Sequence, residues 1–113
     1  MIELEGSGWT LKIFTGEQPI DIANDNLDIE VRLADGTRHG ATFFTLANIA
    51  SLMKKYRETG EGGSGMYFWC SDLVVVRDLA PATIKTCVEE MIEAGELTQA
   101  FHHLEEVPGV TDL

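Results

Sequence analysis

Histidine and cysteine are the side chains in this sequence best suited to hold a metal ion or to act as a nucleophile. The chain has three histidines and two cysteines, namely His39, His102, His103, Cys70 and Cys87. Adjacent histidines on a helix point about 100° apart, so both rarely reach one ion. Neither a C-x-x-C nor an H-x-x-x-H spacing occurs. We therefore predict no metal site and interpret both cysteines as free, small buried hydrophobes.

A glycine-rich segment, Gly60-Glu61-Gly62-Gly63-Ser64-Gly65, has the spacing of the dinucleotide-binding motif G-x-G-x-x-G. That motif works only between a strand and the helix whose N-terminus binds pyrophosphate. Here the segment follows a predicted helix and precedes a predicted strand, and Glu61 would repel phosphate. We interpret it as a flexible connection and predict no cofactor.

Catalytic side chains are not marked by any local pattern. A nucleophilic Ser, Cys or Thr needs a base beside it, and no G-x-S-x-G or comparable motif is present. With 19 acidic residues, no carboxylate pair stands out for acid–base chemistry. We predict no catalytic residue and favour a binding protein over an enzyme; a small enzyme with an unmarked site stays an alternative.

Net charge is the one unusual feature of the composition. There are 19 acids and 8 bases, a net charge of −11. Residues 1–60 hold 9 acids and 6 bases, whereas residues 61–113 hold 10 acids and 2 bases. Such a field repels nucleic acids and anionic membranes and attracts basic proteins. We therefore predict a basic protein partner, with solubility alone as the alternative explanation of the acidity.

The fold is predicted from hydrophobic periodicity. Strands are expected at 9–15, 27–33, 37–43 and, as one long strand kinked at Ser71-Asp72, at 66–76. Helices are expected from Thr45 to Gly60 and from Pro81 to Gly95, followed by a short helical stripe at 97–104. We predict one α+β domain over residues 1–113 in the order β-β-β-α-β-α. Its four-stranded, antiparallel-rich sheet has two to three helices packed mainly on one face.

The turn between the second and third strands is predicted in detail. A three-residue loop, Ala34-Asp35-Gly36 with a left-handed Gly36, sets Leu33 against Thr37 and places the apolar residues of both strands on one face. In that register the partly buried His39 pairs with Val31.

Two surfaces are candidates for binding a partner. The first is the side of the last long helix that carries Glu89 and Glu93, opposite its apolar stripe. The second is the outer face of the sheet, where Tyr67 and Trp69 are expected beside Asp28, Glu30 and Asp72. Aromatic side chains ringed by charge are typical of protein-binding patches. The alternatives are a solvated helix face and a sheet face covered by loop 16–26.

The compartment is predicted from the apolar segments. The first residues have neither the basic nor the apolar region of a secretory signal. The apolar runs are also much shorter than the roughly eighteen residues that a membrane span needs. We therefore expect a cytoplasmic protein.

Part of the sequence resembles a set of small acidic bacterial proteins, mostly uncharacterised, some of which are immunity proteins found beside secreted toxins. The resemblance covers about residues 27–104 and rests on residues 42–49, 53–56, 59–61 and 67–72. It implies an inhibitor that covers a toxin's active site, and no residue role transfers with it. The leading hypothesis is therefore an immunity-type protein that neutralises a basic toxin domain. The alternative is a domain that binds a small ligand or forms a homodimer through its sheet face.

Overall fold

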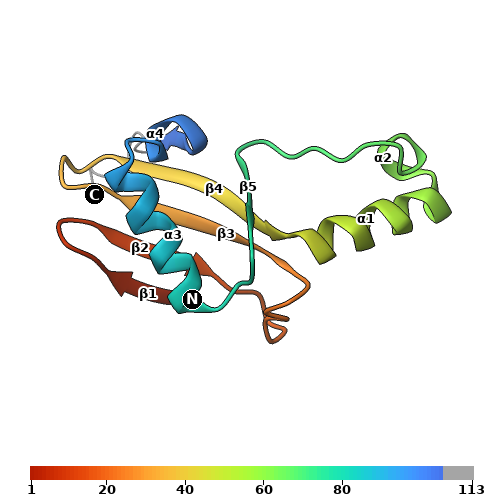
Figure 1. The fold of residues 1–113 in the computed structure, drawn as a ribbon, viewed down its shortest axis with the longest axis horizontal. Helices are drawn as coiled ribbons and strands as arrows, with labels where there is room; N and C mark the ends of the chain where they lie inside the picture. The colour runs from red at the N-terminus through yellow and green to blue at the C-terminus, as the bar shows by residue number, and fades with distance from the viewer. Residues whose placement is uncertain (106–113) are drawn as a thin grey trace, which may run out of the picture.

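A mostly antiparallel sheet forms the centre of the computed structural model, which describes residues 1–105 (Figure 1). Residues 106–113 of the predicted domain lie outside the described part. The strands are β1 (Ile2–Glu5), β2 (Thr10–Phe14), β3 (Asn26–Arg32), β4 (Arg38–Thr45), β5 (Leu73–Val76) and β6 (His102–Leu104). The helices are α1 (Leu46–Thr59), α2 (Glu61–Ser64), α3 (Pro81–Glu93) and α4 (Leu97–Ala100). The predicted α+β class is confirmed, with six strands instead of four.

The β3–β4 hairpin has the predicted register. Ile29 pairs with Ala41 and Val31 with His39, and the amide of Leu33 donates to the carbonyl of Thr37 at 2.9 Å. Gly36 has a φ of 86°, the left-handed conformation that a three-residue turn requires.

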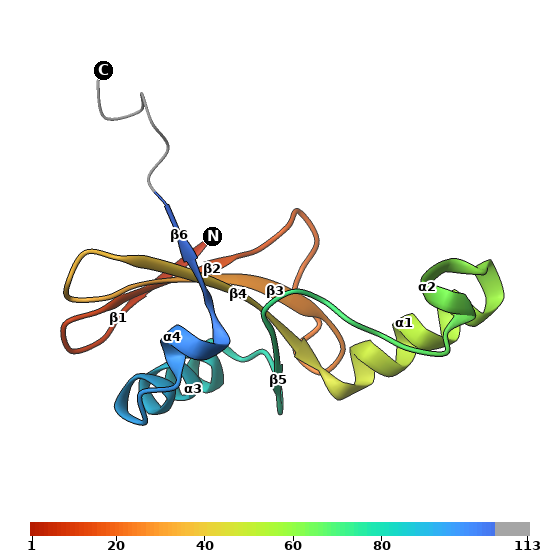
Figure 2. The ribbon, with the colours of Figure 1, turned by 90° about the horizontal axis from the view of Figure 1, so that it is seen from above.

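The core lies on one face of this sheet because apolar residues alternate along its strands. Leu27, Ile29 and Val31 of β3 are buried, whereas Asp28 and Arg32 are exposed on the other face. Helices α3 and α4 cover the buried face, as Figure 2 shows. The buried residues of these two helices are Ile84, Val88 and Leu97. Pro81 begins α3 as predicted, because proline at the first helical position loses no hydrogen bond. No helix of residues 1–105 covers the opposite face of the sheet, which we call the open face.

Strand β4 has two different neighbours along its outer edge. β5 pairs in parallel with the half that contains Thr42 to Thr45. β6 pairs antiparallel with the half from Arg38 to Gly40. The sequence did not predict β6, because the stripe at 97–104 was interpreted as helix throughout. It also did not predict β1.

The helices were predicted to pack mainly on one face of the sheet, but α1 does not pack there. It continues directly from β4 and projects beyond the sheet, together with α2 (Figures 1 and 2). Thr45 caps it by accepting from the amide of Asn48 at 3.2 Å, and a left-handed Gly60 ends it, both as predicted. None of the helix's residues, all of which are described, is buried. We call residues 46–70 the arm.

The segment 66–70 is not a strand, so the prediction of one long strand at 66–76 was wrong for its first half. This segment leaves α2 and returns along α1 towards the sheet (Figure 1). A Cβ on Gly65 would lie 2.3 Å from the carbonyl oxygen of Met53, so the chain passes directly against the helix. Within this segment, the half-buried Phe68 meets the ring of Phe44 at the end of β4, with centroids 5.2 Å apart. The alternation of exposed and half-buried residues therefore does not reflect membership of a sheet.

Membrane-spanning character was sought in the helices of residues 1–105. None of them combines the length and the apolar composition that a bilayer crossing needs.

Candidate functional site

The open face has a hollow where β5 and β6 meet beside β4. Its volume is about 170 Å³. Side chains from four strands and from the turn before β5 line it, among them Phe14, Asp28, Thr42, Asp72, His102 and Leu104. β5 pairs with β4 only from Thr42 onwards, and β6 pairs with it only as far as Gly40. Within the described part of the chain, Ala41 therefore has no partner strand on this edge, and the hollow lies at that gap.

Asp72 and His102 join the two edge strands across this gap. Nδ1 of His102 lies 2.6 Å from Oδ2 of Asp72. The hydroxyl of Ser71 donates to the same oxygen at 2.9 Å. Asp72 has a positive φ of 55°, a conformation that aspartate tolerates better than most residues. The backbone carbonyl of Asp72 accepts from the amide of Thr42 at 3.1 Å, which fixes this turn to β4.

Gly40 makes room for the imidazole of His102. A Cβ at this position would lie 3.3 Å from Cε1 of His102, tighter than most real contacts. The absence of a side chain at Gly40 therefore lets the ring lie over the backbone of β4.

Asp28 provides the second carboxylate of the hollow. It lies on β3 and is exposed. The hydroxyl of Thr42 donates to its Oδ1 at 2.8 Å. Among residues 1–105, no basic side chain forms an ion pair with Asp28. The neutral hydroxyl of Thr42 thus orients this carboxylate, and its negative charge is available to a cation from outside.

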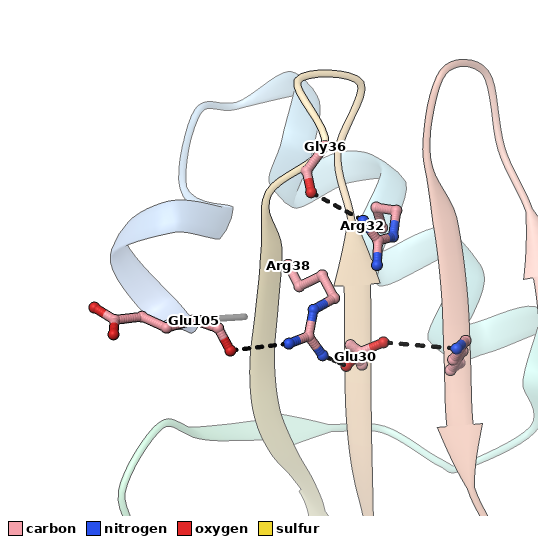
Figure 3. A network of polar contacts seen from close by, with 6 residues as sticks. Glu30, Arg32, Gly36, Arg38 and Glu105 are labelled. Atoms are coloured by element: carbon pink, nitrogen blue, oxygen red, sulfur yellow. Dashed lines mark hydrogen bonds and ion pairs between the residues drawn. The ribbon is translucent and has the colours of Figure 1, made fainter. Parts of the chain in front are cut away.

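Glu30 plays a different part, because basic residues of the protein already surround it. A guanidinium NH of Arg38 donates to it at 2.8 Å, and Lys12 lies 4.0 Å away. The guanidinium also donates to the backbone carbonyl of Glu105 at 3.0 Å, as Figure 3 shows. The carboxylate of Glu30 therefore joins neighbouring strands, and its charge is largely balanced within the protein.

The hollow suits the binding of a cation. Asp28 and Asp72 supply negative charge at its polar side, while Phe14 and Leu104 supply apolar surface. Its hydroxyl and imidazole do not form a nucleophile–base pair, because Ser71 donates to Asp72 and not to His102. The arrangement matches an amine or a guanidinium with an aliphatic stem better than it matches acyl transfer.

The structure brings together three of the residues predicted to bind a partner, Asp28, Glu30 and Asp72. Tyr67 and Trp69 lie instead on the arm, exposed by 55% and 74%. Their predicted place on the sheet beside Asp28 and Glu30 was wrong because segment 66–70 is not a strand. Glu89 and Glu93 are exposed on α3, on the opposite side of the sheet from the hollow.

Sequence reasoning missed most of the other residues that line the hollow, among them Phe14, Thr42, His102 and Leu104. One signal was present in the sequence, the interrupted alternation at Ser71-Asp72. It indicated an irregular backbone there but not which residues lie beside it in the fold.

The remaining histidines and cysteines, His39, His103, Cys70 and Cys87, are not among the residues that line the hollow. His39 is buried, and its Nε2 lies 2.8 Å from the hydroxyl of Thr37. Burial lowers the pKa of His39, and the nearby His103 lowers it further. Burial raises the pKa of the Cys87 thiol, which keeps it protonated and poorly reactive. Within residues 1–105, no three His, Cys, Asp or Glu side chains are arranged to hold a metal ion.

Comparison of the chain with protein-family models, with curated proteins and with solved structures finds no match.

Proposed function

We propose that this protein is a cytoplasmic binding domain of immunity type that holds a basic side chain of a toxin domain in the hollow of its open face. The observation that carries the proposal is the position of Asp28 and Asp72 at one hollow with apolar walls. The net charge of −11 adds long-range attraction for a basic partner.

The chemistry of the hollow determines which side chain fits. A lysine or arginine has an aliphatic stem that packs on apolar surface and a cationic head that seeks carboxylates. Phe14 and Leu104 would contact the stem, and Asp28 would pair with the head. Because nuclease active sites bind phosphate through basic residues, a protein that offers carboxylates at such a site would block it.

The experiment uses the protein as bait in a lysate of its native cell, followed by binding kinetics with the retained protein. Asp28→Asn keeps the shape of the side chain and removes its charge. We expect it to speed dissociation on the order of tenfold or more, as for a charge pair buried on binding. The paired change Glu89→Gln/Glu93→Gln serves as control, because it removes charge on the opposite side and should at most slow association.

Two results would count against the proposal. One is that no basic protein is retained. The other is a retained protein whose dissociation rate is the same for the wild type and for Asp28→Asn.

A small organic cation is the second candidate, since the hollow of about 170 Å³ also matches a diamine or free arginine in size. Such a ligand would raise the melting temperature of the wild type by binding the native state. Titration with putrescine and with arginine tests this, and the shift should disappear in Asp28→Asn. A melting temperature that neither compound changes rejects this candidate.

A further inference from the structure

The arm contains many apolar side chains, but few of its residues are buried. Of residues 46–70, all described, only Gly65 is buried. Yet Met66 is 81% exposed and Leu46 is 71% exposed. A helix of 14 residues is marginally stable in water unless one of its faces is covered.

The side of α1 turned away from segment 66–70 has two distinct halves. Its first half presents an exposed leucine and small residues, namely Leu46, Ala47, Ala50 and Ser51. Its second half presents Lys54 and Glu58 at its centre and Lys55 at one border. Arg57 lies at the other border, where a Cβ on Gly65 would be 3.2 Å from the Cβ of Arg57. Within residues 1–105, none of these three bases forms an ion pair.

α1 is also the one strongly basic element of an acidic protein. It holds three bases and one acid, whereas the rest of the chain holds 5 bases and 18 acids. The loop at 15–25 holds three acids, Glu17, Asp21 and Asp25, and no base.

This acidic loop lies beside the first half of α1. The side-chain amide of Asn24 donates to the hydroxyl of Ser51 at 3.2 Å, and that of Asn26 donates to Asn48 at 2.8 Å. Negative charge therefore lies next to the small-residue half of the helix, and positive charge lies on its other half.

We propose that two copies of this chain associate through antiparallel pairing of their α1 helices about a two-fold axis. Self-complementary halves are what a two-fold interface requires. The helix is about 21 Å long at a rise of about 1.5 Å per residue. With the axis at its midpoint, Lys54 lies level with the partner's Ser51 and Lys55 with the partner's Ala50.

In that arrangement each basic half faces a small-residue half and an acidic loop. The stems of the two lysines pack on Ala47 and Ala50 of the other copy. Their charged ends reach the other copy's loop at 15–25. The pairing covers the exposed start of α1 and neutralises charge in two places at once. The hollow on the open face is not part of this interface.

The test is the mass of the purified protein in solution, measured by sedimentation equilibrium over a wide concentration range. We expect a dimer at low ionic strength. The dissociation constant should rise by about tenfold or more at about 1 M salt, where the screening length falls to about 3 Å. Lys54→Glu/Lys55→Glu should make the protein monomeric, and Lys85→Glu on α3 should leave the dimer intact.

A charge-exchange experiment separates this interface from any other. Glu17→Lys/Asp21→Lys should also be monomeric, because its loop and its arm are then both basic. Mixing it with Lys54→Glu/Lys55→Glu should restore a dimer that contains one copy of each, since both contact regions then join opposite charges. Melting temperatures show whether each variant is folded. Lys54→Glu/Lys55→Glu changes only exposed positions, so its result does not depend on whether the loop tolerates substitution.

Two outcomes would overturn the proposal. A wild-type protein that is monomeric throughout the concentration range has no such interface. A dimer that survives Lys54→Glu/Lys55→Glu but is lost in Val75→Lys uses the outer edge of β5 instead.

Discussion

The hollow on the open face and the arm differ in what holds their residues in place. The hollow lies on β3 and β4, whose other face is packed against α3 and α4. Its side chains are further fixed by short contacts such as Thr42 to Asp28 at 2.8 Å. The arm has one cap at each end of α1, and its apolar side chains are at best half-buried.

This difference indicates two kinds of binding. A rigid site that already points its carboxylates at one space loses little conformational entropy when it binds a ligand. A segment without a core gains stability when a partner covers it. We infer that the hollow selects its ligand by charge and shape, whereas the arm is completed by association.

The largest expected effect comes from the core beneath the hollow. Phe43 is fully buried, and its ring meets that of Phe101 edge-on with centroids 5.9 Å apart. Phe43→Ala should lower the free energy of unfolding by about 3–5 kcal/mol, because it leaves a cavity. Met66→Ala on the arm should change it by less than about 0.5 kcal/mol. Urea denaturation measures both, and similar losses for the two variants would show that the arm has a core of its own.

A smaller effect is expected at the hairpin that connects β3 and β4. Gly36 has a φ of 86° with no other atom within 4 Å of the Cβ position, so only backbone strain opposes a side chain there. Gly36→Val should cost about 1–2 kcal/mol of unfolding free energy. Gly16→Val is the matched control, because Gly16 also has open space and no positive φ. Equal stability of Gly36→Val and the wild type would contradict the bulged turn.

Local sequence signals were sufficient for the hairpin and for α3. Residues 27–33 alternate strictly, and only one register of the turn gathers their apolar side chains. Pro81 and the apolar stripe that follows it mark α3 equally well. In each case a periodic pattern and a residue with special backbone preferences agree.

The arm could not be predicted, because a helix that projects and a helix that packs have the same periodicity. The apolar stripe of α1 is half-covered by segment 66–70, and no local pattern distinguishes that cover from a sheet. The alternation in segment 66–70 is likewise compatible with a strand, and the absence of a neighbouring strand is a property of the whole fold.

The candidate site was predicted in part for a similar reason. Asp28 and Glu30 follow from the alternation of β3, so their place on the outer face was predictable. The contact between Asp72 and His102 depends on β6, a strand of three residues that is too short for a periodic signal. It also depends on two strands that share one edge of β4, which is a long-range arrangement.

The smallest expected effect is a pH dependence that arises at His39, on the packed side of β4. Burial and the nearby His103 lower the pKa of His39 below its ordinary value of 6.5. The unfolded chain therefore binds a proton more readily than the folded one. Stability from this residue is fully present above pH 6.5 and is lost as the pH falls through the ordinary pKa towards the folded one. Thermal unfolding between about pH 7 and pH 5 should show this decline.

His39→Leu is the variant that isolates this contribution, because it fills similar space without a titrating group. Its stability should decline less steeply over the same pH range than that of the wild type. Asp35 and Asp78 do not interfere there, since hydrogen bonds from Thr37 and from Thr83 hold their pKa values below 3.8. They lose their contribution only in more acidic solution. Parallel pH profiles for His39→Leu and the wild type would show that His39 accepts its proton in the fold as readily as in water. The packed side of β4 would then be as open to water as the arm, which would remove the contrast between the two regions.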